Sequence, residues 1–106
     1  MAFEFQIPWT DEAISNLDDI IDYLNDKWTE REIIHFKKKL SRQINLIEQK
    51  PFLFPLSVYN PRLRKAVLGR QTTIFYEVSE QLIYIVFLFS NMQDIRRIAI
   101  PDPSDD

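Results

Sequence analysis

Residues Gln71–Phe89, QTTIFYEVSEQLIYIVFLF, carry the clearest evidence for the fold of this 106-residue chain. Both halves of this stretch are rich in β-branched and aromatic residues, which favour strands, and Ser79-Glu80-Gln81 between them is typical of a hairpin turn. Every residue from Leu82 to Phe89 is apolar. Such a run predicts a strand with both faces covered, and we expect it to lie centrally in a sheet.

A third strand is predicted just before this hairpin, at Leu63–Leu68, and the turn between them contains Gly69, the only glycine of the chain. Upstream lies the segment 50–62, whose three prolines prevent a helix from continuing. We expect this segment to form an ordered arch. The apolar side chains expected to pack on the domain are Phe52, Phe54 and Leu56.

Two amphipathic helices are predicted before the arch. The first starts after Thr10, a residue that can cap a helix, and the second starts at the capping box Thr29-Glu30-Arg31-Glu32. Each helix carries one apolar stripe at spacings of three and four residues. The stripes are Ile14, Leu17, Ile21, Leu24 and Trp28, then Ile33, Phe36, Leu40, Ile44 and Ile47. Hardly any linker separates the helices, so we expect a helical hairpin.

The N-terminal segment Phe3–Ile7 alternates apolar and polar residues and predicts a further strand, which Pro8 ends. The order strand, helix, helix and three strands predicts an α+β sandwich. In this fold a two-helix hairpin packs on a three- to four-stranded, largely antiparallel sheet. We expect one domain at residues 1–98 and an acidic, frayed tail at residues 99–106.

Composition argues against several classes of protein. The chain has no cysteine, so neither disulfides nor thiolate metal sites can form, and this is in keeping with a reducing cytoplasm. The first residues do not resemble a secretory signal, and the longest apolar run is too short to span a membrane. One histidine is too few for a zinc site, and one glycine is too few for a phosphate-binding loop. A serine triad would need His35, but no serine lies in a sequence that resembles a nucleophile turn. We expect no metal, no cofactor and a cytoplasmic location.

Charge is distributed unevenly, although the net charge is only −3. From Met1 to Glu30 one base stands against eight acids, whereas from Arg31 to Arg70 ten bases stand against two acids. A basic middle indicates a surface for phosphates or for an acidic partner, with a solvated helix face as the alternative for Lys37–Lys39 and Arg42. The cations that flank the predicted C-terminal strands are Arg62, Arg64, Lys65, Arg70, Arg96 and Arg97.

Several motifs occur in one order and spacing over about residues 3–97. They are Trp9-Thr-Asp-Glu-Ala-Ile, Asp19-Ile-Ile-Asp-Tyr-Leu, the proline arch, Leu63-Arg-Lys-Ala-Val-Leu, Thr73-Ile-Phe-Tyr-Glu-Val and Ile83-Tyr-Ile-Val-Phe. In this combination the chain resembles the RelE/ParE superfamily of bacterial toxins. The resemblance implies the toxin of a type II toxin–antitoxin module, of the kind linked to plasmid stabilisation. Such a toxin inhibits growth until a cognate antitoxin blocks it.

The resemblance also implies one of two activities. RelE-like members cleave messenger RNA on the ribosome with a cluster of cations, whereas ParE-like members poison DNA gyrase. Lys65 matches a lysine of the nuclease cluster, but the other expected cation positions hold Val67, Thr73 and Met92. Residues that could substitute for the missing cations are Arg70, Arg96 and Arg97. Because the cluster is incomplete and the chain is acidic, unlike a ribosome ligand, the resemblance is closer to the ParE-like branch.

We therefore expect a gyrase-poisoning toxin rather than an enzyme, with an antitoxin as partner and no sequence-specific DNA binding. Two alternatives stay open. One is a non-toxic binding module of the same fold. The other is a ribosome-dependent endoribonuclease with the catalytic candidates Lys65, Arg70, Arg96 and Arg97. The residues expected to bind the antitoxin or the target are Arg62, Arg64, Lys65 and Arg70.

Overall fold

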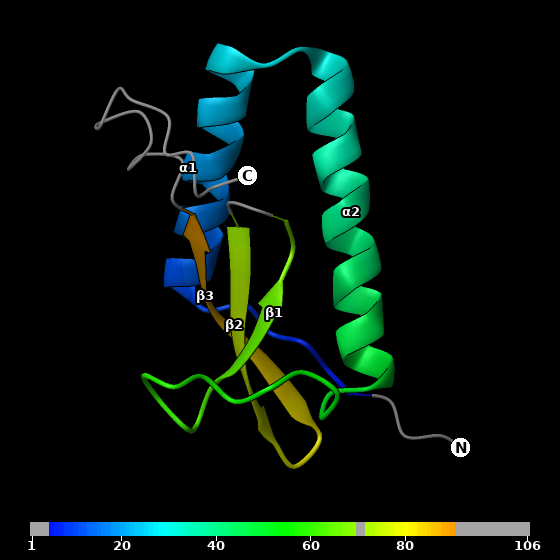
Figure 1. Ribbon diagram of the computed structural model, residues 1–106, viewed down its shortest axis with the longest axis vertical. Coiled ribbons are helices and arrows are strands. Elements are labelled where there is room, and N and C mark those ends of the chain that lie inside the picture. Colours follow the sequence, from blue (N-terminus) through cyan, green and yellow to red (C-terminus); the bar gives the residue numbers. More distant parts are fainter. Residues whose placement is uncertain (1–4, 70–71, 91–106) are drawn as a thin grey trace.

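The computed structural model describes residues 5–69 and 72–90 and has the predicted α+β order (Figure 1). The helices are α1 (Asp11–Lys27) and α2 (Glu30–Gln49). The strands are β1 (Arg64–Val67), β2 (Thr72–Ser79) and β3 (Leu82–Ser90). The helices run side by side in opposite directions and extend beyond one end of the sheet (Figure 1). Neither helix of the described chain is long and apolar enough to cross a membrane.

Helix α1 begins at the predicted cap, Thr10. The Thr10 hydroxyl accepts a hydrogen bond from the Ala13 amide at 3.0 Å, as an N-terminal cap should. The same hydroxyl donates to the Val86 carbonyl at 2.6 Å. One side chain therefore both starts the helix and ties it to β3.

The predicted stripe of α1 is confirmed only in its middle, where Leu24 is buried and Leu17 and Ile21 pack partly buried against the core. The buried residues of α1 are Ala13, Ile20 and Leu24. Ile14 and Trp28, which were expected inside, are 48% and 41% exposed. Successive helix residues lie about 100° apart, so burial of the small Ala13 turns Ile14 outward.

Helix α2 matches the prediction at both its start and its buried side. The Glu32 amide donates to the Thr29 hydroxyl at 3.3 Å, and the Glu32 carboxylate accepts from the Thr29 amide at 3.1 Å, which completes the capping box. Ile33, Phe36, Leu40 and Ile47 are buried. Ile44 is partly buried against the same core.

The sheet is antiparallel in the order β1-β2-β3, so β2 and not β3 is the central strand. The hairpin turn between β2 and β3 is where expected, with Glu80 at a φ of 56°. The expectation that β3 lies centrally with both faces covered is wrong. One face of β3 is buried in the core, whereas its other face is only partly covered.

The outer edge of β3 is covered by the N-terminal segment instead of by a regular strand. Gln6 and Trp9 form isolated parallel bridges to β3, and the Ile83 and Ile85 amides donate to the Gln6 and Pro8 carbonyls at 2.9 and 3.0 Å. Pro8 has no N–H group, so it cannot return such a bond and regular pairing is interrupted. The predicted strand Phe3–Ile7 is therefore wrong in its described part. Residues 1–4 and the predicted tail 99–106 lie outside the described residues.

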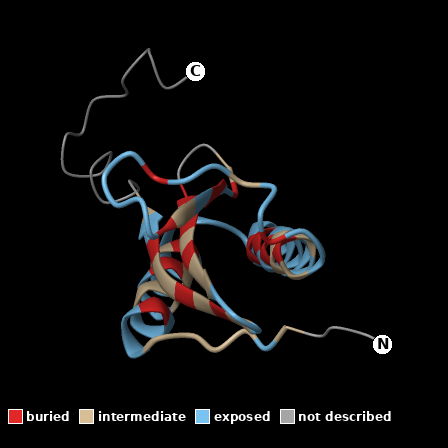
Figure 2. Ribbon diagram, turned by 90° about the horizontal axis from the view of Figure 1, so that it is seen from below, coloured by how far each residue is buried: buried red, intermediate tan, exposed pale blue. Residues whose placement is uncertain are grey.

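The core lies between the helices and one face of the sheet. It joins Leu24 of α1 and Phe36 of α2 to the inward residues of the strands in one cluster, and Figure 2 shows buried residues concentrated on the strands and on the inner sides of the helices. The inward strand residues are Ala66, Ile74, Tyr76, Ile83, Ile85 and Leu88. A shift in register between Phe75 and Tyr76 keeps these residues on one face.

The arch between α2 and β1 is ordered but packs less than predicted. Phe54 meets the Tyr76 ring edge-on, with 6.3 Å between the ring centres. Phe52 and Leu56, which were also expected to pack, are 64% and 49% exposed. The arch is held mainly by backbone bonds, since the Ser57 amide donates to the Leu63 carbonyl at 2.7 Å and the Lys65 amide to the Pro55 carbonyl at 2.9 Å.

Candidate functional site: the open face of the sheet

The sheet face opposite the core has no buried residue among those described. Register places Lys65 opposite Phe75 and Phe75 opposite Phe87, so the three side chains share this face. We call the surface the open face. Its residues are Lys65, Val67, Thr73, Phe75, Glu77, Tyr84, Phe87 and Phe89.

Most of the open face is apolar. The Phe75 and Phe87 rings stack with their centres 4.7 Å apart. Beside them Val67 is 55% exposed and Phe89 is 50% exposed. An apolar cluster exposed in this way is typical of a surface that another molecule covers.

One rim of the open face is polar and hollowed. The Arg62 guanidinium forms an ion pair with the Glu77 carboxylate at 3.1 Å. The pair borders a hollow of about 470 Å³ whose lining also includes Asn60 and Phe87. The Asn60 side chain accepts from the Arg62 amide at 3.0 Å, which orders this end of the arch.

Two further apolar side chains project from the arch just before this rim. Val58 is 87% exposed and Tyr59 is 91% exposed. The Tyr59 amide donates to the Ser57 hydroxyl at 3.1 Å, and Ser57 is itself buried, so the backbone that presents them is fixed. Because the arch holds these side chains outward, they can contribute contact area to the same surface.

The predicted cations do not gather on one surface. Arg64 lies opposite the buried Tyr76 and so points to the core side of β1, away from Lys65. Its guanidinium donates to the Phe54 carbonyl at 2.7 Å and sits 5.1 Å from the centre of the Phe52 ring. The guanidinium of Arg64 is therefore held by the arch and does not lie on the open face.

Only part of the predicted nuclease cluster can be located. Lys65 is exposed on the open face, and the neighbouring positions hold Val67 and Thr73, neither of which carries a charge. The remaining candidates, Arg70, Arg96 and Arg97, lie outside the described residues, as does Met92, which stands where the resemblance implies a cation. Among the described residues no group of three histidine, cysteine or acidic side chains is placed to hold a metal. His35, the only histidine, is exposed on α2 and so is not part of the open face.

Tyr76 on the core side is a structural phenol. Its hydroxyl donates to the Pro51 carbonyl at 2.7 Å. Burial raises the pKa of Tyr76 to about 12, and the charge of Arg64 only partly offsets this rise. A phenol held protonated in this way joins the arch to the sheet and is unsuited to act as a base.

The cations of the open face are evident from the sequence, but its apolar character was not predicted. The missed residues are Val58, Tyr59, Phe75, Phe87 and Phe89. Alternation along the two C-terminal strands carries the signal, because residues next to buried ones point the other way. In an all-apolar strand, however, both faces look alike, and only the register separates them.

Comparisons with known proteins agree with this geometry. The model of a family described as the ParE toxin of the type II toxin–antitoxin system parDE matches residues 7–95. A chain of the chromosomal ParDE system from P. aeruginosa has a TM-score of 0.71 at 18% identity, over 84% of this chain and 98% of that chain. A chain of the DinJ–YafQ complex from E. coli has a TM-score of 0.58 at 10% identity, over 85% and 97%. No curated protein matches by sequence.

The fold is thus the compact α+β sandwich of the RelE/ParE toxins, two helices on a three-stranded antiparallel sheet. The family match covers most of the chain, and the chain belongs to the ParE toxin family of type II toxin–antitoxin systems. The resemblance inferred from the sequence is confirmed, including its greater closeness to the ParE branch.

Proposed function

We propose that this toxin arrests growth by binding a protein target, DNA gyrase, through the open face. The observation that carries the proposal is the stacked pair Phe75–Phe87, flanked by exposed Val67 and Phe89. Protein interfaces concentrate aromatic and aliphatic side chains at their centres and place charges at the rim. Lys65 and the Arg62–Glu77 pair occupy such rim positions.

Cleavage of RNA is the second candidate, and Lys65 is the residue that favours it. Phosphate transfer needs cations positioned on the charge that develops in the transition state, and each lost contact costs about 3 to 4 kcal/mol by analogy with an oxyanion hole. Val67 and Thr73 supply no such contact. We therefore expect no ribosome-dependent cleavage of messages.

We propose that a cognate antitoxin lies across the open face rather than extending the sheet by a strand. Both edges of the sheet are already occupied. At β3 the Gln6 and Pro8 carbonyls accept strand amides, and at β1 the Lys65 amide donates to the arch while the Gln43 side chain donates to the Val67 carbonyl at 2.9 Å. Few backbone groups are then left for an added strand, so side-chain contacts must supply the affinity.

The test is induced expression with and without the neighbouring gene, comparing the parent with Val67→Glu. Val67 is 55% exposed in the free protein, so the charge of a glutamate at this position would be buried only when a partner covers the open face. We expect the variant to bind its target on the order of tenfold more weakly, as for loss of an interface contact of about 1.4 kcal/mol, and colony formation to recover as a result. Gyrase supercoiling in extracts should recover in parallel.

The matched control is Ile14→Glu, the same kind of change at a site 48% exposed on α1. It should leave growth arrest intact. Equal loss of growth arrest in both variants, with both folded by circular dichroism, would contradict the open face as the binding site.

Mapping the 5′ ends of messenger RNA in a translation reaction tests the second candidate, cleavage of RNA. Codon-phased cuts that vanish in Lys65→Ala would establish the nuclease instead.

A further inference from the structure

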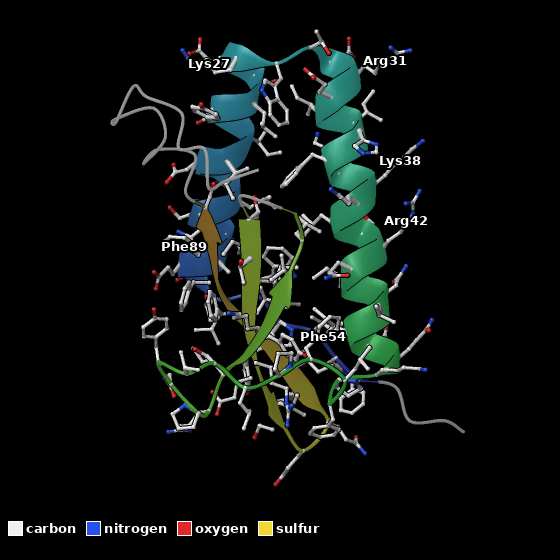
Figure 3. All side chains as sticks on the ribbon, in the orientation of Figure 1. Lys27, Arg31, Lys38, Arg42, Phe54 and Phe89 are labelled. Carbon is white, nitrogen blue, oxygen red and sulfur yellow. The ribbon has the colours of Figure 1, made fainter. Side chains whose placement is uncertain are left out.

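Helix α2 carries a line of basic side chains on the side turned away from the sheet. Figure 3 shows Arg31, Lys38 and Arg42 projecting from this side. With His35 they follow the spacing i, i+4, i+7 and i+11, which keeps side chains on one face of a helix. All four residues are exposed. We call this line the basic stripe.

No ion pair among the described residues involves the basic stripe, although Arg31 stands between Glu30 and Glu32 in the sequence. The ion pairs found among the described residues are Lys27–Asp26 and Arg62–Glu77, and neither includes a residue of the basic stripe. From Ile33 to Ile47 the sequence contains no acid. Next to the stripe, a hollow of about 480 Å³ is lined by Ile34, Lys37, Lys38, Ser41 and Arg42.

The neighbouring basic residue Lys39 belongs to a different side of the helix. Its ammonium lies 3.3 Å from where a Cβ on Gly69 would stand, at the end of β1. One turn further on, the Gln43 side chain donates to the Val67 carbonyl. The predicted patch Lys37–Lys39 with Arg42 is therefore divided: Lys39 faces the sheet, and the stripe faces solvent.

The two helices of the hairpin expose side chains of opposite charge. Helix α1 exposes acids, namely Asp11, Glu12, Asp18, Asp19, Asp22 and Asp26, while α2 exposes the basic stripe. The whole chain has a net charge of −3. A polyanion is consequently repelled by most of the molecule and attracted to one side of α2, which sets the orientation in which it can approach.

We propose that the basic stripe binds the phosphate backbone of duplex DNA without reading its sequence. From residue 31 to residue 42 a helix rises about 16 Å, which matches about five phosphates of one strand at roughly 3.4 Å of axis each. Apart from the imidazole of His35, the stripe has no aromatic ring on which an unpaired base could stack, so it offers little stacking along a single strand and suits a duplex better. Ile34 is the one apolar residue that lines the hollow beside the stripe, too little for the core of a protein interface.

This proposal is independent of the open face, because the basic stripe lies on a helix and the open face lies on the far side of the sheet from the core. A protein target bound at the open face would leave the stripe free to touch DNA that the target holds. Failure of one proposal therefore leaves the other standing.

The experiment measures the fluorescence anisotropy of a labelled 20-base-pair duplex titrated with the purified toxin. We expect weak binding at low salt, with a slope of log K against log salt of about −3 for three cations. Lys38→Glu combined with Arg42→Glu should weaken binding by on the order of tenfold or more. The control is Arg62→Glu with Lys65→Glu, the same change of charge on the open-face side, which should weaken binding clearly less than the stripe variant because these charges do not contact the duplex.

Two results would overturn the proposal: no binding of the duplex at low salt, or equal weakening by both double variants. Poly-glutamate and a single-stranded RNA of the same length serve as competitors. If poly-glutamate displaces the duplex as well as unlabelled duplex does, the stripe binds acidic protein. If the RNA is the better competitor, the stripe is a single-strand site. Circular dichroism of each variant confirms that the fold is retained.

Discussion

Tyr76 and Arg64 show how single residues join the arch to the sheet. Tyr76 is fully buried, its ring meets Phe54 and its hydroxyl bonds the Pro51 carbonyl. Arg64, next to it across the strands, holds the Phe54 carbonyl. Both residues anchor the loop that presents Val58 and Tyr59, so they support the surface from behind and need not touch a partner.

Replacement of Tyr76 by phenylalanine tests this anchor. The change leaves the Pro51 carbonyl without its donor, and we expect it to destabilise the fold by about 1 to 2 kcal/mol at pH 7. The folded pKa of about 12 exceeds the usual value of 10.0, so the phenol stabilises the fold below pH 10 and this contribution is lost as pH rises toward 12. Urea unfolding at pH 7, 10 and 11.5 should show the difference between the two proteins closing. A difference that stays constant with pH would contradict the buried, protonated phenol.

At the scale of elements, α2 is the helix whose buried side is best defined. Leu40 is 8% exposed, whereas Ile34 on the same helix is 48% exposed. We expect Leu40→Ala to cost about 2 to 5 kcal/mol, because it empties part of the core. Ile34→Ala should cost about 0.5 kcal/mol or less. Thermal unfolding of both variants measures the difference, and equal melting temperatures would show that the inward side of α2 has been misplaced.

The sequence predicts those elements whose signals are local. The caps at Thr10 and Thr29 each bond a residue three positions away, so they fix the starts of the helices. The order of the strands depends instead on pairing between residues that are far apart in the sequence. The covered edge of β3 rests on contacts such as Thr10 with Val86, 76 positions apart, and no local pattern encodes them. The side of α1 that is buried likewise depends on how closely Ala13 approaches the sheet.

The candidate site was predictable only in part for the same reason. Lys65 could be placed on a strand from sequence, but its separation from Arg64 requires knowing which face is the core. The contacts that Arg64 makes with the arch depend on the conformation of a proline-rich loop, and hydrophobic periodicity does not predict the conformation of such a loop. The aromatic cluster needs the register of β2 with β3, including the shift at Phe75.

At the scale of the whole molecule, opposite charges lie on different sides, and this should govern how fast the antitoxin associates. Because Arg64 is held by the arch, the informative reversal is Arg62→Glu with Lys65→Glu. Rim charges contribute little affinity singly, so we expect slower association and a weaker dependence on salt, with dissociation nearly unchanged. Surface-binding kinetics at two salt concentrations measure this. Unchanged rates at both would mean that the antitoxin is seated elsewhere.

The pairing of the N-terminal segment with β3 has a consequence for biosynthesis. A ribosome makes a chain from its N-terminal side onward, so Gln6 and Pro8 emerge long before Ile83 and Ile85, whose amides donate to their carbonyls. During that interval α1 lacks the strand to which Thr10 and Asn16 bond, the latter accepting from the Leu88 amide at 3.0 Å. The sheet closes only after the last strand is released. A nascent chain stalled before Leu82 can therefore form its helices but cannot complete the surface on which toxicity would depend.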